Sequence, residues 1–514
     1  MKLFNRFLAL GWLLLAVRLP AERINQEGRI LGPATIVTNA ILFNTPEADA
    51  MVSAMQIFPV TSAWNEDISR RPVLANSDAM IAQIIADLVA INLNRRTLRA
   101  FYEMNFVLVP DNQPRLPIHF LDYPEESDLD GGTDPYGSYP IPSNMPIETW
   151  PHDNTNTLAA WQQDLNNDGG DRHAIIVQPG NGFIWEMWQA KRVGTNWEAS
   201  NGAKFDLKSN VLRSNGWTSA DAAGLAMFPA LPRFDECERG VVEHACRIVV
   251  AKSKYNSYIY PATHYAAPTN NTSPNLPSMG QRVRLKASYV ITNSWTKQEK
   301  TVLVALKKYG AIVADNGSFF SISVTPDDRW PSSCFNNFNS LDITNFEVIQ
   351  TTGPNEGPRS AGAPAASAGA DQTVTSASGT TLQGFVNFTG APPTNQWKLY
   401  SGPGTVTFGN AAQTNTTASF SAPGVYTLLL SADDGMHAVA YDAVVITVIQ
   451  AITLNIALLG TNASLSWTGG VPPFVVEQTD FLPASSWSGV VTTSLQTAGV
   501  PLTRSNSFFR VRGN

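Results

Sequence analysis

The sequence predicts a mainly β protein with a large jelly-roll or double β-sandwich domain and a few short helices. An immunoglobulin-like β-sandwich and a small C-terminal β-module are expected to follow. Short runs of Val, Ile, Thr, Phe and Tyr recur along the chain, as in β-strands. Clusters of Gly, Pro, Asn and Asp separate these runs, at about 8–12-residue spacing in the tail. Helical periodicity of apolar residues is clear in only two segments.

The first 21 residues have the pattern of a secretory signal peptide. Lys2 and Arg6 form a basic start, residues 7–17 form an apolar stretch, and Ala21 lies at a plausible cleavage point. The apolar stretch is too short to span a bilayer, and no later window reaches about 18 uninterrupted apolar residues. We therefore expect a secreted or cell-surface protein without a transmembrane segment.

Residues 22–352 are expected to form the main β-rich domain. Ser77 is a candidate N-cap for a helix over 77–88, and a second helix is predicted over 297–308. A one-turn helix is predicted at 217–224. The remaining elements are predicted as strands in a largely antiparallel arrangement, at 102–109, 117–120, 173–177, 183–188, 242–250, 283–290, 310–313 and 319–324.

The rest of the chain divides into a linker and two smaller units. Residues 353–370 are rich in Gly, Pro, Ala and Ser, so we expect a linker with little apolar surface to pack. Residues 371–449 contain the alternating short runs of an immunoglobulin-like sandwich. Residues 450–514 read as a small C-terminal β-module.

Three short motifs stand out in residues 371–449. They are Gly402-Pro403-Gly404, Phe420-Ser421-Ala422-Pro423-Gly424-Val425-Tyr426-Thr427-Leu428 and Asp433-Asp434-Gly435. Together they resemble the PKD-like domains of bacterial extracellular proteins. Such domains serve as spacers or adhesive units on secreted polymer-degrading enzymes and surface proteins. The resemblance therefore implies where the protein works, while any chemistry is expected upstream.

Residues 55–352 carry a second set of motifs. They include Trp64-Asn65-Glu66-Asp67, Gly170-Asp171-Arg172-His173, Gly216-Trp217-Thr218-Ser219-Ala220-Asp221, Glu243-His244-Ala245, His264-Tyr265 and Ala314-Asp315-Asn316-Gly317. This region resembles an uncharacterised family of secreted bacterial β-rich proteins that are often joined to sandwich modules. The resemblance implies no activity, so the site has to be argued from residue chemistry.

Composition excludes several classes of function. The net charge is −7 and only 15% of residues are charged, which argues against nucleic acid as a partner. No HExxH, paired CxxC, phosphate-binding glycine loop or GxSxG motif occurs, which disfavours zincins, zinc ribbons, nucleotide enzymes and standard α/β-hydrolases. Cys237 and Cys246 could bridge neighbouring strands, leaving Cys334 over, or all three could be buried thiols.

Ionisable residues are dense between 170 and 316, in a chain otherwise poor in charge. This set contains Arg172, His173, Glu186, Asp206, Asp221, Asp235, Glu236, Glu243, His244, His264 and Asp315. Glycoside hydrolysis needs two carboxyl groups, one of them with a raised pKa. Polysaccharide elimination needs a base and a cation, and metal-assisted hydrolysis needs a His/Asp/Glu cluster.

The predicted catalytic set is Asp206, Asp235, Glu236, His244 and His264. Neighbouring strands would bring the loops that carry these residues to one end of a sheet. Glu236 or Asp235 would be the protonated acid, Asp206 the base or nucleophile, and His264 a stabiliser of developing charge.

Three further residues are predicted to bind substrate. Arg172 would orient a sugar or stabilise developing charge, and Trp217 or Tyr265 would stack on the apolar face of a sugar ring. The competing interpretation is that the predicted site residues serve turns and helix caps in unrelated loops.

Two acidic, glycine-containing loops are candidate sites for structural Ca²⁺. The candidate ligands are Asp164, Asn166 and Asp168 in one loop and Asp128, Asp130 and Asp134 in the other. Ile175 stands where the first loop would need a bidentate acid, so a complete calcium loop is not expected there.

Two functions remain open from the sequence. The first is a secreted carbohydrate-active enzyme, a glycoside hydrolase or polysaccharide lyase, which cleaves an extracellular polysaccharide by carboxylate acid/base chemistry and requires no cofactor. The second is a non-catalytic glycan-binding or surface-attachment protein. Both functions occur in proteins of this fold class, so only the geometry of the site can distinguish them.

Overall fold

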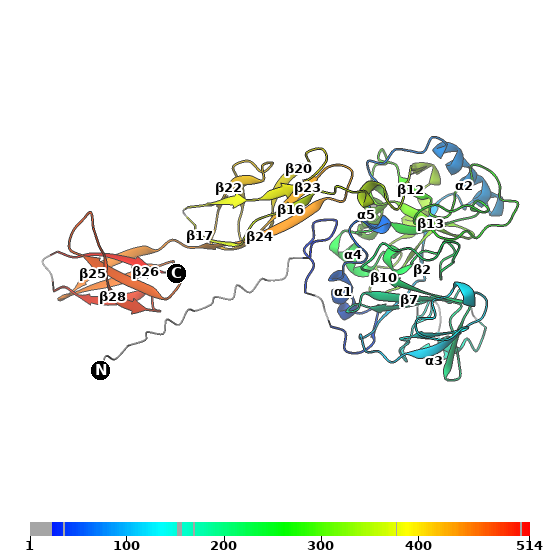
Figure 1. Cartoon of the computed structure of the whole chain (residues 1–514), viewed down its shortest axis with the longest axis horizontal. Helices are drawn as coiled ribbons and strands as arrows, with labels where there is room; N and C mark the ends of the chain where they lie inside the picture. Colours follow the sequence, from blue (N-terminus) through cyan, green and yellow to red (C-terminus); the bar gives the residue numbers. More distant parts are fainter. Residues whose placement is uncertain are drawn as a thin grey trace, which may run out of the picture.

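Figure 1 shows a large main body joined to two smaller β-units, which follow it in a row. The computed structural model describes residues 23–33, 36–151, 157–167, 170–376, 378–503 and 506–513. The predicted signal peptide lies outside these residues. Within them, no helix is long and apolar enough to cross a membrane.

Among the described residues, three sheets build the main body, and the prediction of a mainly β fold is confirmed. In spatial order, the first sheet contains β1 (Ile41–Leu42), β3 (Val107–Leu108), β6 (Ala174–Gln178), β7 (Phe183–Trp188) and β10 (Asn201–Asp206). The second contains β15 (Phe346–Val348), β12 (Arg282–Leu285), β13 (Ala311–Asn316), β11 (Cys246–Val250), β14 (Phe320–Val324) and β2 (Leu98–Tyr102). The third contains β5 (Tyr136–Tyr139), β4 (Leu116–Phe120), β9 (Asn196–Ala199) and β8 (Lys191–Val193).

The strands pair in both directions, whereas the sequence suggested a largely antiparallel domain. The pairs β11–β13, β14–β2, β3–β6 and β4–β9 are parallel. Strand β6 is buried along its whole length, which is typical of a strand covered on both faces. The prediction missed the parallel pairs because an apolar run predicts a strand but carries no information about the direction of the strand it pairs with.

Helices lie against these sheets in the main body (Figure 1). They are α1 (Pro46–Ser53), α2 (Ser77–Ile91), α3 (Leu158–Gln163), α4 (Phe234–Arg239) and α5 (Lys297–Lys308). The helices predicted at 77–88 and 297–308 are confirmed as α2 and α5. Helix α5 starts with a capping box, since the Thr296 hydroxyl accepts from the Glu299 amide and the Glu299 carboxylate accepts from the Thr296 amide.

The helix predicted at 217–224 is wrong, because this segment is a series of turns. The Ser219 hydroxyl donates to the Leu225 carbonyl at 2.6 Å and accepts from the Asp221 amide at 2.9 Å. These side-chain bonds to the backbone compete with helical hydrogen bonds. They hold Asp221 in the interior of the main body, where its side chain is fully buried.

The strand predicted at 102–109 is also divided, into the end of β2 and the whole of β3. The Asn105 side-chain amide lies between them and donates to the carbonyls of Ile147 at 2.8 Å and Trp150 at 2.9 Å. A buried side chain that bonds backbone groups in this way interrupts the ladder. The predicted strand at 242–250 starts only at Cys246, and the three cysteines of the chain are free and buried.

The two tail units are β-sandwiches with separate cores. The first has a sheet of β17 (Gln372–Thr375), β24 (Ala440–Ile449), β23 (Gly424–Asp433) and β20 (Thr394–Ser401), and a sheet of β18 (Thr380–Gln383), β22 (Asn415–Phe420) and β21 (Val406–Phe408). The second has a sheet of β25 (Thr453–Leu459), β26 (Asn462–Thr468) and β29 (Thr497–Pro501), and a sheet of β28 (Ser488–Thr493), β27 (Phe474–Thr479) and β30 (Phe508–Arg512). Trp397 and Tyr426 fill the first core, and Trp467 and Phe474 fill the second.

Residues 353–370 pack more closely than a linker of this composition suggests. The short strand β16 (Ala365–Ser367) pairs with β19 (Phe385–Asn387) of the first sandwich. Arg359, which ends a 3₁₀ turn, is buried and donates to the Glu66 carboxylate of the main body at 2.9 Å. Polar side-chain contacts of this kind leave no signature in a Gly/Pro/Ser-rich composition. The segment therefore fastens the first sandwich to the main body.

Candidate functional site

A cluster of charged side chains lies inside the main body around Arg247 of β11. We call Glu103, Glu148, His173, Asp221, Arg247, Asp315 and Ser323 the Arg247 cluster. The Arg247 guanidinium forms two hydrogen bonds with the Asp221 carboxylate, at 2.7 and 3.0 Å, and a third with the Ser323 hydroxyl at 2.8 Å. The side chains of Arg247 and Asp221 are 3% and 0% exposed, so the ion pair lies in the interior and each charge has its partner there.

His173 precedes β6 and extends the cluster. Its Nδ1 lies 2.8 Å from the Glu148 carboxylate, and its Nε2 lies 3.0 Å from the Ala220 carbonyl oxygen, one residue before Asp221. Both partners are acceptors, so both ring nitrogens donate and the ring is an imidazolium. Burial opposes this charge, but the Glu148 carboxylate outweighs burial and raises the pKa of His173 to about 9. The pKa of Glu148 is lowered, because the charge and hydrogen bonds of His173 outweigh its own burial.

Two other carboxyl groups of the cluster titrate near neutrality. Burial, reinforced by Glu148, raises the pKa of Glu103 to about 7, and Glu103 accepts a hydrogen bond from Ser323. Burial, reinforced by Asp221, raises the pKa of Asp315 to about 7. Asp315 lies 3.6 Å from the Arg247 guanidinium and remains 28% exposed. The cluster therefore meets solvent through a carboxyl group that can carry a proton at neutral pH.

The Arg247 cluster contains carboxyl groups of different protonation state. Glu148 is held ionised by His173, while Glu103 and Asp315 exchange protons near pH 7. Pairs of carboxyl groups with separated pKa values are what general acid/base catalysis requires. Ion networks with a purely structural role also shift pKa values, so the shifts alone do not indicate a site. The cluster is a candidate site because Asp315 is partly exposed and can therefore reach a substrate.

Glu186 of β7 lies deeper and has a different environment. Its carboxylate accepts three hydrogen bonds from the backbone amides of Met227 and Phe228, at 2.8–3.0 Å, and the side chain is fully buried. Burial raises its pKa to about 7 despite these bonds. Because it has no exposed surface, Glu186 serves to hold the 227–228 segment.

Three members of the predicted catalytic set come together elsewhere, in and after α4. Glu236 lies 2.7 Å from the Arg233 guanidinium and 3.3 Å from His244 Nε2. Burial opposes its charge, but Arg233 lowers the pKa of Glu236 to about 2. Asp235 lies 2.9 Å from Arg239, and its pKa is raised mainly by burial.

The space beside this group is small. A cavity of about 30 Å³ is lined by Glu236, His244 and Arg29, among others. Arg29 comes from the segment that starts the described chain and forms two hydrogen bonds with the Glu243 carboxylate, at 2.6 and 2.8 Å. This volume holds a water molecule but no sugar ring.

The structure describes no contact that joins Asp206 or His264 to the α4 residues. Asp206 ends β10 with an exposed side chain that accepts from the Lys208 amide at 2.9 Å. The His264 Nδ1 lies 2.8 Å from the carbonyl oxygen of Ala222, the residue after Asp221. His264 therefore contacts the backbone next to Asp221, and the predicted set falls in three places.

The predicted substrate-binding residues are equally dispersed. Arg172 is buried and donates to the backbone carbonyls of Ala190 and Trp161, which is a structural role. The ring of Trp217 lies 5.6 Å from the Arg213 guanidinium, and Tyr265 stacks on His264 with 5.7 Å between the ring centroids.

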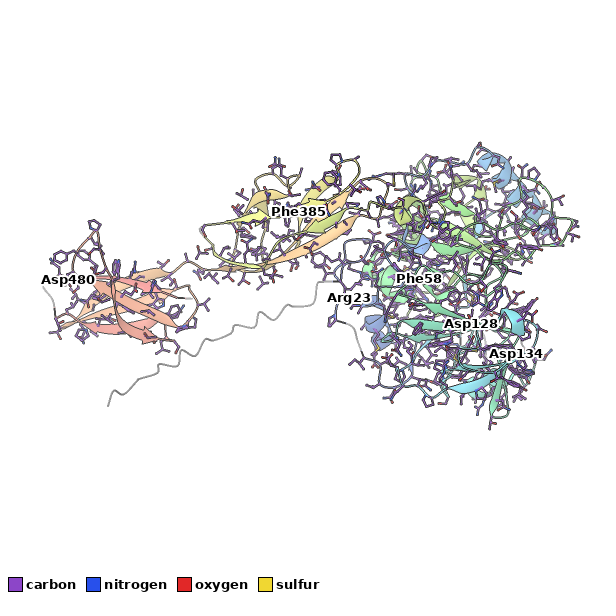
Figure 2. The ribbon with its side chains drawn as sticks, viewed as in Figure 1. Arg23, Phe58, Asp128, Asp134, Phe385 and Asp480 are labelled. Carbon is purple, nitrogen blue, oxygen red and sulfur yellow. The ribbon has the colours of Figure 1, made fainter. Side chains whose placement is uncertain are left out.

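The candidate calcium ligands are largely engaged by cations. Asp130 accepts from Lys204 Nζ at 2.7 Å and from Trp185 and Arg115, and Asp128 is paired with Arg213. Asp128 and Asp134 both lie in the main body (Figure 2). Asp164 lies 3.5 Å from Arg172.

The two remaining candidate calcium ligands are Asn166 and Asp168. Asn166 is exposed, and Asp168 lies outside the described residues. Across the described part of the chain, no group of three His, Cys, Asp or Glu side chains is arranged to hold a metal ion. Structural Ca²⁺ stays a prediction.

The predicted catalytic residues stay a prediction, and the Arg247 cluster draws on other members of the ionisable set. Asp221, Asp315 and His173 were in that set but were not chosen for the site, while Glu103 and Glu148 lie outside the 170–316 window. Asp315 comes directly before Asn316-Gly317, which is a strong turn signal, and Asp221 falls in the helix predicted at 217–224. Only the β2–β14 pairing brings Glu103 beside Ser323, so no local signal identifies it.

Comparison with known proteins identifies one unit of the chain. Residues 368–448 match a family model for a PKD domain, close to the sandwich predicted at 371–449. No curated protein matches the chain significantly.

Several solved structures are similar to parts of the chain. The solution structure of the PKD domain from the KIAA 1837 protein is 25% identical and covers 16% of this chain and 85% of that one, with a TM-score of 0.15. A crystal structure of three titin domains is 11% identical and covers 32% of this chain and 73% of that one, with a TM-score of 0.19. The insect immune protein hemolin is 10% identical and covers 40% and 52%, also with a TM-score of 0.19.

Proposed function

We propose that this chain, whose residues 368–448 form a PKD domain, is a secreted carbohydrate-active enzyme that cleaves an extracellular polysaccharide. The observation that supports it is the Arg247 cluster, where Asp315 and Glu103 have pKa values of about 7 beside an ionised Glu148. The proposal moves the acid/base role from Asp206, Asp235 and Glu236 to this cluster.

The chemistry follows from the protonation states. Asp315, which is partly exposed, donates its proton to the leaving glycosidic oxygen. Glu148 stays ionised beside His173 and accepts a proton from the attacking water. Arg247 holds Asp221 and lies 3.6 Å from Asp315, so it stabilises Asp315 once its proton has left. The bond to the anomeric carbon breaks, water adds to that carbon, and no cofactor is needed.

A secreted location fits the other features of the chain. Residues 1–21 read as a signal peptide, and PKD-like domains occur on extracellular proteins that act on polymers. The low content of charged residues leaves a surface suited to neutral polar polymers.

A panel of polysaccharides, assayed for release of reducing ends and for retention of the protein, tests the proposal. Asp315→Asn should lower reducing-end release at least about 100-fold, the usual size of a general-acid effect, and leave retention unchanged. Asp206→Asn is the matched control, because Asp206 is an exposed aspartate outside the cluster, and it should behave as wild type. Equal release by wild type and Asp315→Asn would reject the assignment.

The second candidate is a non-catalytic glycan-binding or surface-attachment protein. The arrangement of two sandwiches in a row behind the main body favours it (Figure 1). In that case every residue of the Arg247 cluster has a structural role, which is consistent with the hydrogen bonds between its members. Retention on a polysaccharide without any release of reducing ends would favour this function.

A further inference from the structure

Ser360, His437 and Asp434 lie together where residues 353–370 meet the first sandwich. The Ser360 hydroxyl oxygen is 3.0 Å from His437 Nε2, and His437 Nδ1 is 2.6 Å from the Asp434 carboxylate. The turn after β23 supplies Asp434 and His437, and the 3₁₀ turn at Gly357–Arg359 leads into Ser360. A hydroxyl, an imidazole and a carboxylate in this order are the parts of an activated serine nucleophile.

The turn holds the imidazole in one orientation. The backbone amides of Met436 and His437 donate to Asp434 Oδ1 at 2.9 and 2.8 Å, which leaves Oδ2 for His437 Nδ1. A carboxylate only accepts, so Nδ1 carries a hydrogen, and in the neutral form of the ring the Nε2 lone pair faces Ser360. The His437 side chain is 5% exposed, which limits other orientations.

The serine hydroxyl has a choice of acceptors. Ser360 Oγ also lies 2.6 Å from the Gly357 carbonyl oxygen and 3.6 Å from Met436 Sδ, so its single hydrogen can serve only one of these acceptors or His437 at a time. A rotation about the Cβ–Oγ bond is enough to direct it to Nε2. Such a rotation is a fast side-chain motion and requires no movement of the backbone.

A pocket and two arginines adjoin this group. His437, Met436, Pro358 and Tyr441 line part of a cavity of about 140 Å³ between the main body and the first sandwich, together with Arg70 and Arg71. The guanidinium of Arg71 lies so close to Gly357 that a Cβ at this position would collide with it. An Arg70 nitrogen lies 3.5 Å from the corresponding position of Gly435. Two guanidinium groups thus flank the segments that carry Ser360 and His437. Each is paired with a carboxylate that also lines the cavity, Arg71 with Glu66 at 2.9 Å and Arg70 with Asp433 at 3.1 Å.

We propose that Ser360, His437 and Asp434 form an acyl-transfer site that hydrolyses short-chain carboxylic esters. Ser360 Oγ attacks the ester carbonyl carbon while His437 Nε2 takes the hydroxyl proton, and the carbonyl oxygen becomes an oxyanion. The intermediate collapses, the bond to the alkoxy oxygen breaks, and Nε2–H protonates the leaving alcohol. Water then attacks the acyl-serine with His437 as base, which releases the carboxylic acid and restores Ser360.

A fluorophosphonate probe and p-nitrophenyl acetate, applied to the full chain, test the proposal. The probe should label Ser360, as identified by mass spectrometry of the labelled peptide, and hydrolysis of the ester should fall at least about 100-fold in Ser360→Ala. Ser340→Ala is the matched control, because Ser340 also lies at the end of a 3₁₀ turn and donates to a carbonyl three residues earlier, at 2.7 Å. It should keep both properties of the wild type.

Three outcomes would overturn the proposal: no labelled serine, labelling of a serine other than Ser360, or wild-type ester hydrolysis by Ser360→Ala. The melting temperature of Ser360→Ala, measured in parallel, should match that of the wild type, so that loss of hydrolysis reports on chemistry. Asp315→Asn should keep ester hydrolysis, which separates this site from the polysaccharide site.

Discussion

His173 and Glu148 keep each other charged inside the main body, and this pairing makes stability depend on pH. The folded-state pKa of His173 is about 9, above the ordinary value of about 6.5. The contribution of His173 is therefore complete below about pH 6.5 and is lost as pH rises through 9. Glu148, whose pKa is lowered, contributes above its ordinary value of 4.5 and loses that contribution as pH falls below it.

We predict that the wild type loses on the order of 1–3 kcal/mol of unfolding free energy between pH 7.5 and 9.5 through His173. His173→Gln should be less stable at pH 7.5 and should lack this part of the pH dependence. Urea unfolding of both proteins at the two pH values measures it. An identical loss in both proteins would show that His173 is not charged in the folded state.

At the scale of elements, helix α4 depends on the ion pair between Glu236 and Arg233. Both side chains are less than 10% exposed, so removal of one charge leaves the other unpaired in the interior. Glu236→Gln should lower the free energy of unfolding by about 3–5 kcal/mol and leave reducing-end release by the folded protein unchanged. Glu238→Gln, on the same helix, should cost less than about 1 kcal/mol, because Glu238 is 43% exposed.

Chemical denaturation of these two variants measures the difference. If Glu236→Gln kept full stability but lost polysaccharide cleavage, Glu236 would be the catalytic acid, as predicted from the sequence. Equal stability losses in Glu236→Gln and Glu238→Gln would contradict the role of the buried pair.

Apolar periodicity predicted the helices and strands better than it predicted which elements pack together. The apolar periodicity after Ser77 predicted α2, but the N-cap prediction was wrong, because Asn76 is the N-cap residue and Ser77 is the first residue of the helix. Strand β7 at 183–188 was predicted with its observed bounds. The segment at 217–224 has helical composition, but the bonds of Ser219 to the backbone override that preference. Glu103 could not be predicted as a site residue, because its neighbours in the cluster come from distant segments.

At the scale of the whole molecule, Arg359 connects the main body to the first sandwich. It donates to Glu66 at 2.9 Å and lies over the Tyr260 ring at 4.7 Å, and Arg70 and Asp433 form a second, exposed contact at 3.1 Å. The PKD domain itself was predictable from its motifs. The packing of residues 353–370 was not, because it depends on the Arg359 side chain and on the pairing of β16 with β19, which the composition of the segment does not reveal.

We predict that a chain ending at residue 352 folds but melts at a lower temperature than a chain ending at residue 360. Loss of Arg359 removes one of the charges paired with Glu66, and Arg71 remains at 2.9 Å, so the cost should be about 1–3 kcal/mol. Arg359→Ala in the full chain should cost a similar amount, whereas Arg70→Ala should cost less than about 1 kcal/mol. Equal thermal stability of the two truncated chains would contradict this role.

The most direct test of the proposed polysaccharide-cleaving site is the pH dependence of kcat/KM for reducing-end release. Asp315 needs a proton to act as the acid, so activity should fall as pH rises through about 7. Activity should also fall at acidic pH, below the ordinary glutamate value of 4.5, as Glu148 takes up a proton. The account predicts this bell-shaped profile in the wild type and in Asp206→Asn, and near-zero activity in Asp315→Asn. A rate independent of pH between about 5 and 9, or full activity in Asp315→Asn, would contradict it.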